Sequence, residues 1–168
     1  MKRILLLSDT HGCLDEFILK HAQEADELWH AGDIGPVSIA DNLSRIKPLR
    51  AVYGNIDDYA VRLQYPETLC FNAEGLRVAM LHIAGLPGKY LPKSKALLQE
   101  FRPDVLICGH SHLLKIVRDP VHRHLHLNPG AAGVHGFHKV RTMVRFIVEG
   151  GKIREMDVLE MPRKVAST

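Results

Sequence analysis

The first third of the chain alternates short apolar runs with amphipathic stretches, and this alternation restricts the fold more than any other feature. Residues 3–8 contain the run Ile-Leu-Leu-Leu, which is typical of a strand buried on both faces. Two further strands are predicted at residues 27–31 and 49–53. Between the strands, residues 15–25 and 38–46 place apolar side chains at helical spacing. Strands that alternate with helices predict a parallel sheet covered by helices.

The rest of the chain is dominated by predicted strands. The turn sequence Asn-Ala-Glu-Gly separates two apolar segments and predicts a hairpin. The elements expected here are a hairpin of residues 68–71 and 76–81, a helix at 94–101, and strands at 105–108, 113–117, 122–127, 142–148 and 152–159. Together the two parts predict an α/β fold in which two packed sheets, mixed parallel and antiparallel, form a sandwich flanked by helices.

The length of the chain, 168 residues, suits one compact domain. We expect a single domain over residues 1–161 and a loose C-terminal tail over residues 162–168. No apolar run approaches the ~20 residues that a membrane helix needs, and the first apolar run is too short for a secretion signal. We therefore expect no membrane partner and a cytoplasmic location.

Charge and cysteine usage exclude some classes of function. The net charge of +3 and the scattered Lys and Arg residues give no strong signal for nucleic-acid binding. Cys13, Cys70 and Cys108 are widely spaced and form no C-x-x-C pair, which argues against a disulfide framework and against a thiolate zinc site. Histidine is the unusual residue, with 11 copies, and imidazole is the commonest protein ligand for metal ions.

Metal-binding side chains follow five of the predicted strands. They are Asp9, His11, Asp33, Asn55, His82, His110 and His112. Ligands in α/β sheets bind beyond the carboxyl ends of strands, so these side chains are expected to lie together. A set of carboxylate, amide and imidazole groups without thiolate suits Mn²⁺, Fe, Zn²⁺, Co²⁺ or Ni²⁺. A single Gly-Asp or Gly-Asn pair also marks turns, so the ordered combination carries this prediction.

In this order, the motifs D-x-H, G-D, G-N, an isolated His and G-H-x-H resemble the signature of the calcineurin-like metallophosphoesterases. The resemblance covers about residues 1–130, including a late Asn-Pro-Gly turn at residues 128–130. The short length is similar to the small YfcE-like phosphodiesterase branch of that superfamily. The resemblance implies the α/β/β/α metallophosphoesterase fold and a phosphodiesterase or phosphatase activity, with a phosphodiester preferred.

The resemblance also implies a centre of two divalent ions, for which we favour Mn²⁺. It assigns the ligands as Asp9, His11 and His112 for the first ion, Asn55, His82 and His110 for the second, and Asp33 for both. In the superfamily a hydroxide that bridges the two ions attacks a phosphate ester. The resemblance therefore places Asp9, Asp33 and Asn55 in the catalytic set. It leaves the oligomeric state open, since relatives are often dimers or tetramers.

Two positions depart from the superfamily pattern. Many members carry His directly after the motif asparagine, where it is assigned to protonation of the leaving group. Here Ile56 takes that place and Asp57 keeps the acidic position that follows, so the general acid is unassigned. The other departure is Ile83, which follows His82 where the superfamily more often has glycine.

The remaining histidines have other expected roles. His122, His124 and His126 alternate, which predicts one face of a strand, and we prefer a solvated or subunit-contact face to a third metal site. His30 is expected to pack beside the site. His135 and His138 lie in a glycine-rich stretch that is expected to border the substrate pocket.

Two other functions compete with a metal-dependent hydrolase. One is a non-catalytic, metal-binding scaffold for other proteins, because a retromer subunit shares this fold without the activity. The other is a DNA nuclease of the same superfamily, but such relatives are larger and carry added domains. A decayed site would have lost ligands, whereas all seven positions here keep a residue that can bind metal. This favours the enzyme.

Overall fold

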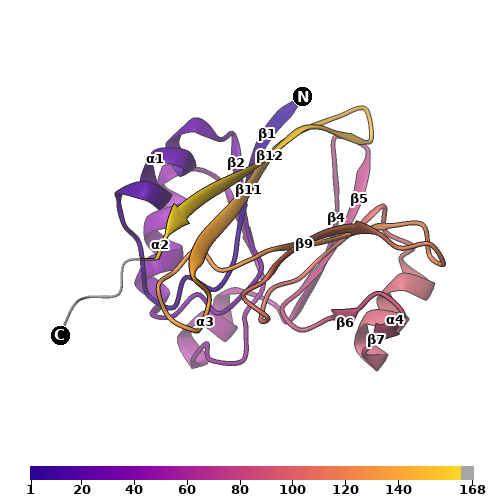
Figure 1. Cartoon of the computed structure of the whole chain (residues 1–168), viewed down its shortest axis with the longest axis horizontal. Coiled ribbons are helices and arrows are strands. Elements are labelled where there is room, and N and C mark those ends of the chain that lie inside the picture. The colour runs from indigo at the N-terminus through magenta and orange to yellow at the C-terminus, as the bar shows by residue number, and fades with distance from the viewer. Residues whose placement is uncertain (164–168) are drawn as a thin grey trace.

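The structure, a computed structural model, describes residues 1–163 of the chain (Figure 1). The strands are β1 (Lys2–Leu7), β2 (Glu27–His30), β3 (Leu49–Ala51), β4 (Thr68–Ala73), β5 (Leu76–Leu81), β6 (Gly85–Leu86), β7 (Lys89–Tyr90), β8 (Val105–Ile107), β9 (Leu114–Arg118), β10 (Leu125–Pro129), β11 (Val140–Glu149) and β12 (Lys152–Pro162). The helices are α1 (Glu16–Glu24), α2 (Val37–Ile46), α3 (Tyr59–Gln64) and α4 (Pro92–Glu100).

The strands form two five-stranded sheets and a short hairpin. Sheet A has the order β12-β11-β1-β2-β3, and sheet B has the order β4-β5-β8-β10-β9. Strands β1, β2 and β3 are parallel, as the alternation of strands and helices predicts, while β11 and β12 add antiparallel neighbours. In sheet B the parallel strands β5, β8 and β10 lie between two antiparallel edge strands. Strands β6 and β7 form the separate hairpin.

The two sheets pack face to face, with α1 and α2 on one outer side and α4 on the other (Figure 1). The successive side chains of β1 explain why its apolar run is unbroken. Ile4 and Leu6 join the core between the sheets, whereas Leu5 and Leu7 join the core beneath the helices. Since alternate residues of a strand point to opposite faces, both faces of β1 are buried. The predicted fold of two mixed sheets flanked by helices is confirmed.

Two side-chain contacts fix the start of α1. The Asp15 carboxylate accepts a hydrogen bond from the Ile18 amide over 3.3 Å and so caps the helix. The same carboxylate accepts two bonds from the guanidinium of Arg141, at 2.6 and 3.1 Å. Arg141 is 3% exposed and also donates to the Ala132 carbonyl over 2.7 Å. The helix is thereby attached to the segment that follows β10.

Several predicted boundaries need correction. Strand β10 begins at Leu125 rather than at His122, so the stretch of alternating histidines lies mostly in the preceding turn. Helix α3 and the β6–β7 hairpin were not predicted. Pro162, placed in the predicted tail, pairs with Val140 at the end of β12. The rest of that tail, from residue 164, lies outside the described residues.

The described residues bear on the expectations for membrane helices and for cysteine pairing. No helix within residues 1–163 is both long and apolar enough to cross a membrane. The three cysteines are unbonded, and Cys108 is buried at 3% exposure. Trp29 is fully buried, and its indole nitrogen donates to Glu27 over 3.0 Å.

Candidate metal centre

The seven predicted ligands come together where the carboxyl ends of strands from both sheets meet. Loops after β1, β2 and β3 carry four of them, and loops after β5 and β8 carry the other three. Ligand atoms of six residues form two groups, each with all its atoms within 4.8 Å of one another: Asp9, His11 and His112 in the first group, and Asp33, His82 and His110 in the second. The grouping follows the division that the sequence resemblance implies for these residues.

The backbone is strained at most of these positions. Five of the seven have positive φ angles: Asp9 (54°), His11 (44°), Asp33 (54°), His110 (71°) and His112 (59°). Only four other non-glycine residues in the described chain share this conformation. A non-glycine residue in the left-handed region is uncommon and costs about 1 kcal/mol or more. Such strain gathers at functional sites, where the surrounding structure holds it in place.

The two oxygens of Asp9 have different surroundings. Oδ2 accepts hydrogen bonds from the Ser8 hydroxyl at 2.6 Å and from the His110 amide at 3.1 Å. Oδ1 is buried, has no hydrogen-bond partner within residues 1–163, and lies 3.2 Å from Nε2 of His112. Burial raises the pKa of Asp9, but the hydrogen bonds and charges of its neighbours outweigh that effect and hold the pKa below its usual value. Asp9 is therefore a carboxylate with one free oxygen.

Asp33 lies between the two groups. Its Oδ2 is 3.4 Å from Nε2 of His11 and 3.2 Å from Nε2 of His82, while its Oδ1 accepts a hydrogen bond from the Ile56 amide at 3.1 Å. Burial raises the pKa of Asp33, but the contacts with His82 and the other neighbours lower it by more. The pKa of Asp33 therefore lies below its usual value, and the carboxyl group stays ionised. One oxygen thus faces a histidine of each group.

The orientation of the His82 ring is fixed by a hydrogen bond on the side away from the cluster. Its Nδ1 lies 2.7 Å from the carbonyl oxygen of Ala31 and therefore donates a hydrogen bond to it. In the neutral ring the lone pair is then on Nε2, which faces Asp33. Gly32 leaves room for the ring, since a Cβ there would lie 2.6 Å from Nδ1 of His82. The departure at Ile83 does not remove His82 from the cluster.

Asn55 and His110 complete the cluster at its open side. The amide oxygen of Asn55 is 3.0 Å from Nδ1 of His110, and both residues are exposed. The departure at Ile56 places an apolar side chain beside them, 46% exposed. Asp57 is buried and accepts hydrogen bonds from the amides of Gly54 and Gly35, so it shapes the loops.

The residues fit divalent metal ions on three observations. The cluster contains buried polar atoms without a hydrogen-bond partner in the described chain, namely Asp9 Oδ1, His11 Nε2 and His82 Nε2. Its donors are carboxylate oxygens and imidazole nitrogens, which suit borderline and hard divalent ions. Finally, glycines allow the close packing around it, since a Cβ at Gly54 would lie 2.1 Å from Oδ1 of Asp33.

Further residues surround the cluster. Nε2 of His30 is 2.9 Å from the Thr10 hydroxyl, and burial lowers the pKa of His30 to about 3, so it is a neutral packed neighbour as expected. His135 and His138 line an open cavity of about 440 Å³ above the cluster. The His135 ring lies 4.7 Å from that of His11, and the His138 ring lies 5.2 Å from that of His112.

Sequence reasoning missed the residues that orient the ligands. Ser8 holds one oxygen of Asp9, and nothing in the sequence distinguishes it from an ordinary strand-end serine. Asn128 donates to the Gly109 carbonyl at 2.8 Å and to Ser111 Oγ at 3.1 Å, and so supports the loop that carries His110 and His112. The Asn-Pro-Gly motif was the only sequence signal for this role.

The prediction for the alternating histidines is corrected in part. His122 is exposed, but His124 and His126 are each 1% exposed and face the protein interior. The Tyr90 hydroxyl lies 2.8 Å from Nε2 of His124 and 3.0 Å from Nδ1 of His126. A hydroxyl has one hydrogen, so it donates to one ring and accepts from the other. Two of the three histidines therefore form a buried hydrogen-bonded group instead of a solvated face.

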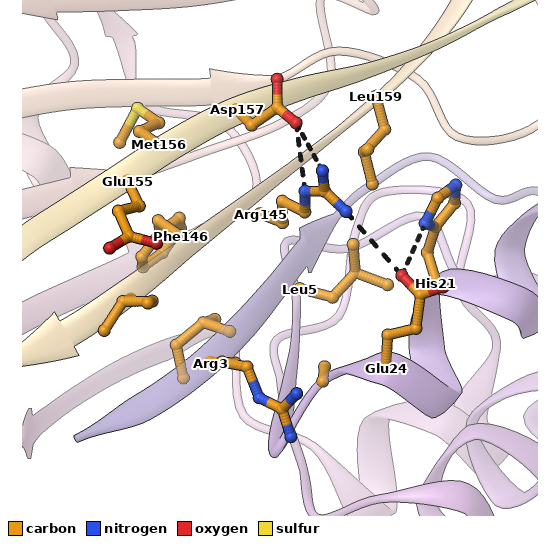
Figure 2. Close-up of a pocket in the computed structure, with 13 residues that line it drawn as sticks. Arg3, Leu5, His21, Glu24, Arg145, Phe146, Glu155, Met156, Asp157 and Leu159 are labelled. Carbon is orange, nitrogen blue, oxygen red and sulfur yellow. Dashed lines mark hydrogen bonds and ion pairs between the residues drawn. The ribbon is translucent and has the colours of Figure 1, made fainter.

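A larger cavity, about 620 Å³, lies elsewhere, between α1 and strands β11 and β12 (Figure 2). Figure 2 shows Arg145 pointing towards Asp157 on one side and Glu24 on the other, at 2.8 and 3.8 Å. None of the predicted ligands lines it. Size alone therefore does not locate the site, and the polar cluster does.

Two mixed sheets between helices, with clustered oxygen and nitrogen ligands at their carboxyl edge, define the class as an α/β protein with a candidate metal centre. The sequence then gives the particular family. The family model of the calcineurin-like phosphoesterase superfamily domain matches residues 1–151, and the chain belongs to this superfamily. The resemblance drawn from the ligand motifs is confirmed.

Individual relatives agree with this assignment. A probable metallophosphoesterase of Methanothermobacter thermautotrophicus is 29% identical over 136 residues, which cover 77% of this chain and 76% of that protein. A predicted phosphoesterase of Streptococcus pneumoniae has a TM-score of 0.67 at 22% identity, over 96% of this chain and 90% of that one. Vps29 of Entamoeba histolytica, solved in complex with zinc, has a TM-score of 0.71 at 14% identity, over 95% and 99%. The two structural likenesses show the shared fold.

Proposed function

We propose that this protein is a phosphodiesterase that hydrolyses small phosphate esters with two divalent metal ions. The observation that carries the proposal is the position of Asp33, whose Oδ2 lies within 3.4 Å of a histidine from each ligand group. A carboxylate oxygen between two adjacent sets of ligands is what a centre with a shared ligand requires. Asp9, His11 and His112 would hold one ion, and Asn55, His82 and His110 the other.

When bound, two divalent ions supply positive charge to the phosphate and lower the pKa of a water molecule that attacks it. The protein itself fixes the orientation of the side chains that would bind the ions. Main-chain amides and Ser8 fix one oxygen each of Asp9 and Asp33, so the other oxygen of each faces the centre. Ala31 holds the ring of His82 in the same way. Such preorganised ligands need little rearrangement when an ion binds.

The preference for diesters and for Mn²⁺ is part of the proposal and rests on the resemblance to the small phosphodiesterase branch. The cavity above the cluster is open, which is compatible with substrates that carry two substituents on phosphorus. Ile56 offers no proton to a leaving group and the general acid is unassigned, so we expect the fastest turnover with esters that have good leaving groups.

The likeness to Vps29 supports a second candidate. One solved Vps29 binds zinc, and its name marks a vacuolar sorting protein. By this second candidate, the chain would bind metal at the same cluster and serve as a scaffold for another protein. The two candidates predict the same metal uptake, but they differ in turnover and in the requirement for a protein partner.

The test uses metal-free protein with bis-p-nitrophenyl phosphate and p-nitrophenyl phosphate, each with Mn²⁺, Ni²⁺, Zn²⁺ or Mg²⁺. We expect metal-dependent turnover, faster on the diester, that is lost in Asp33→Ala. Asp157→Ala removes an exposed carboxylate of the other cavity and serves as the matched control, with unchanged turnover. Stoichiometric metal uptake without turnover of either ester would reject the hydrolase and favour the scaffold.

A further inference from the structure

The side chain of Phe137 projects fully into solvent, with a relative exposure of 102%. Phenylalanine is among the residue types most often buried, and an isolated ring in water loses the benefit of burial. Phe137 lies in the segment between β10 and β11, and it lines the cavity above the candidate metal centre. The exposure therefore occurs at the opening of the site.

The segment that carries Phe137 is held in place by specific contacts. Gly136 has a φ of 121°, and a Cβ there would lie 2.3 Å from Nδ1 of His112, so the backbone passes directly against this ligand. Arg163 donates hydrogen bonds to the carbonyl oxygens of Gly136 and Val134, the latter at 3.2 Å. Nε2 of His138 is 2.9 Å from the Gly133 carbonyl. The structure thus fixes the loop and presents its aromatic ring outward.

Two other apolar side chains border the same opening. Ile56 follows β3 and is 46% exposed, and Leu113 follows β8 and is 65% exposed. These two residues and Phe137 come from three separate loops, and we call them the apolar rim. The floor of the cavity is formed by the polar residues of the cluster. A ligand in this cavity would contact the polar residues of the cluster at the floor and the apolar rim at the opening.

We propose that the apolar rim is a subsite for a planar aromatic substituent of the substrate, an aryl group or a nucleobase, with Phe137 as its stacking surface. This inference rests on the proposed function, because the phosphate of such an ester would be placed at the metal centre. An aromatic ring stacks on Phe137 with offset or edge-to-face geometry, and Ile56 and Leu113 add apolar contact. The rim selects the substituent and does not take part in the reaction.

The test measures binding, so it is independent of turnover. Metal-loaded protein is titrated calorimetrically with phenylphosphonate and methylphosphonate, which share the phosphonate and differ in the ring. Thymidine 5′-phosphate and deoxyribose 5-phosphate form the second pair and distinguish a nucleobase from a simple aryl group. We expect at least one aromatic member to bind roughly tenfold more tightly than its partner.

Variants assign the preference to the rim. In Phe137→Ala we expect most of the preference to disappear, with affinity for methylphosphonate and metal content unchanged. Phe137→Leu keeps an apolar side chain and should retain only part of the preference. Val121→Ala, a change at an apolar residue of 75% exposure outside the cavity, should leave it intact.

Three results would overturn the subsite. They are equal affinities within both pairs, an equal loss for both members in Phe137→Ala, and a change in oligomeric state as the only effect of that substitution. Failure of turnover with the aromatic preference still present would reject the hydrolase alone.

Discussion

The amide nitrogen of His110 donates a hydrogen bond to Oδ2 of Asp9 over 3.1 Å, although 101 positions separate the two residues. The hydroxyl of Ser8 donates to the same oxygen at 2.6 Å. Oδ2 thus accepts hydrogen bonds from the protein itself, whereas Oδ1 has no hydrogen-bond partner among residues 1–163. One carboxylate therefore has a structural oxygen and an oxygen that is available to an ion.

This division predicts that Asp9→Asn keeps the fold and loses the metal. The amide oxygen of Asn can accept both hydrogen bonds, while its NH₂ group replaces the free oxygen and cannot bind a cation. We expect the metal-free variant to unfold within a few degrees of the unsubstituted protein, and the rise in unfolding temperature on addition of Mn²⁺ to disappear. Calorimetry with and without the ion measures both. An undiminished rise would show that Asp9 holds no ion.

Ser8→Ala tests the supporting hydrogen bond in the same way. Residues that orient a metal ligand typically contribute 10–100-fold to affinity, so we expect a loss of about that size. Metal titration followed by calorimetry gives the affinity. The variant should still bind metal, in contrast to Asp9→Asn.

Two glycines allow a matched test of the packing around His82. Gly32 has a φ of 98°, and a Cβ there would lie 2.6 Å from Nδ1 of His82. Gly88 has a φ of 82°, but a Cβ there would meet nothing within 4 Å. Both Ala substitutions carry similar backbone strain of about 1 kcal/mol, yet only Gly32→Ala displaces the ring. We expect Gly32→Ala to lose metal affinity and Gly88→Ala to keep it. Equal affinities would mean that the ring position is not required.

Two arginines should differ strongly in what they contribute to stability. Arg141 is buried at 3% exposure and bonded to Asp15 and to a main-chain carbonyl, whereas the Arg145 side chain is 50% exposed where it pairs with Asp157. Arg141→Ala leaves the buried Ala132 carbonyl without its donor, whereas the Asp15 carboxylate is 41% exposed and can bind water instead. We therefore expect this variant to lower the free energy of unfolding by about 1–3 kcal/mol. Arg145→Ala is expected to lower it by less than about 1 kcal/mol. Urea unfolding of both variants compares them.

The backbone strain at His110 predicts that relieving it would raise the stability of the fold and lower its affinity for metal. His110 has a φ of 71°, where glycine is unstrained. In the metal-free protein, His110→Gly should therefore raise the free energy of unfolding by up to about 1 kcal/mol, while it removes a side chain of the proposed second ion site. Glu155→Gly relieves similar strain, at a φ of 50°, outside the cluster and should leave metal uptake unchanged. A His110→Gly variant less stable than the unsubstituted chain would contradict the argument.

The buried histidines predict a loss of stability in acid. Burial lowers the pKa of His126 to about 4, and that of His124 is lowered by the same cause. The unfolded chain takes up these protons near pH 6.5, so stability is full above that pH and is lost as the pH falls towards 4. His126 alone accounts for up to about 3 kcal/mol across this window.

His126→Gln isolates this effect from that of other histidines. Gln stays neutral and can still bond to the Tyr90 hydroxyl. We expect its free energy of unfolding to fall less steeply between pH 7 and pH 5 than that of the unsubstituted protein, as measured by urea unfolding at each pH. His122→Gln changes an exposed histidine of the same stretch and should leave the profile unchanged. Parallel profiles for His126→Gln and the unsubstituted protein would refute the assignment.

The sequence predicted those features that local patterns encode. The apolar run of β1 showed a doubly buried strand, and polar residues after successive strands showed the cluster, because strand ends and metal ligands leave local signals. The six-residue helix α3 is too short for a clear period, and β6 and β7 have two residues each. The burial of His124 and His126 depends on Tyr90, 34 and 36 positions away, and an alternating pattern does not reveal a distant partner.

The distribution of the ligands between the two sheets has a consequence for the order of folding. The loops of sheet A supply Asp9, His11, Asp33 and Asn55, and those of sheet B supply His82, His110 and His112, so each group draws on both sheets. During synthesis, neither group is complete until His110 and His112 have emerged and sheet B has docked. An ion would then bind only to chains in which the two sheets have already folded and packed together. Metal uptake would therefore distinguish correctly folded chains from incompletely folded ones.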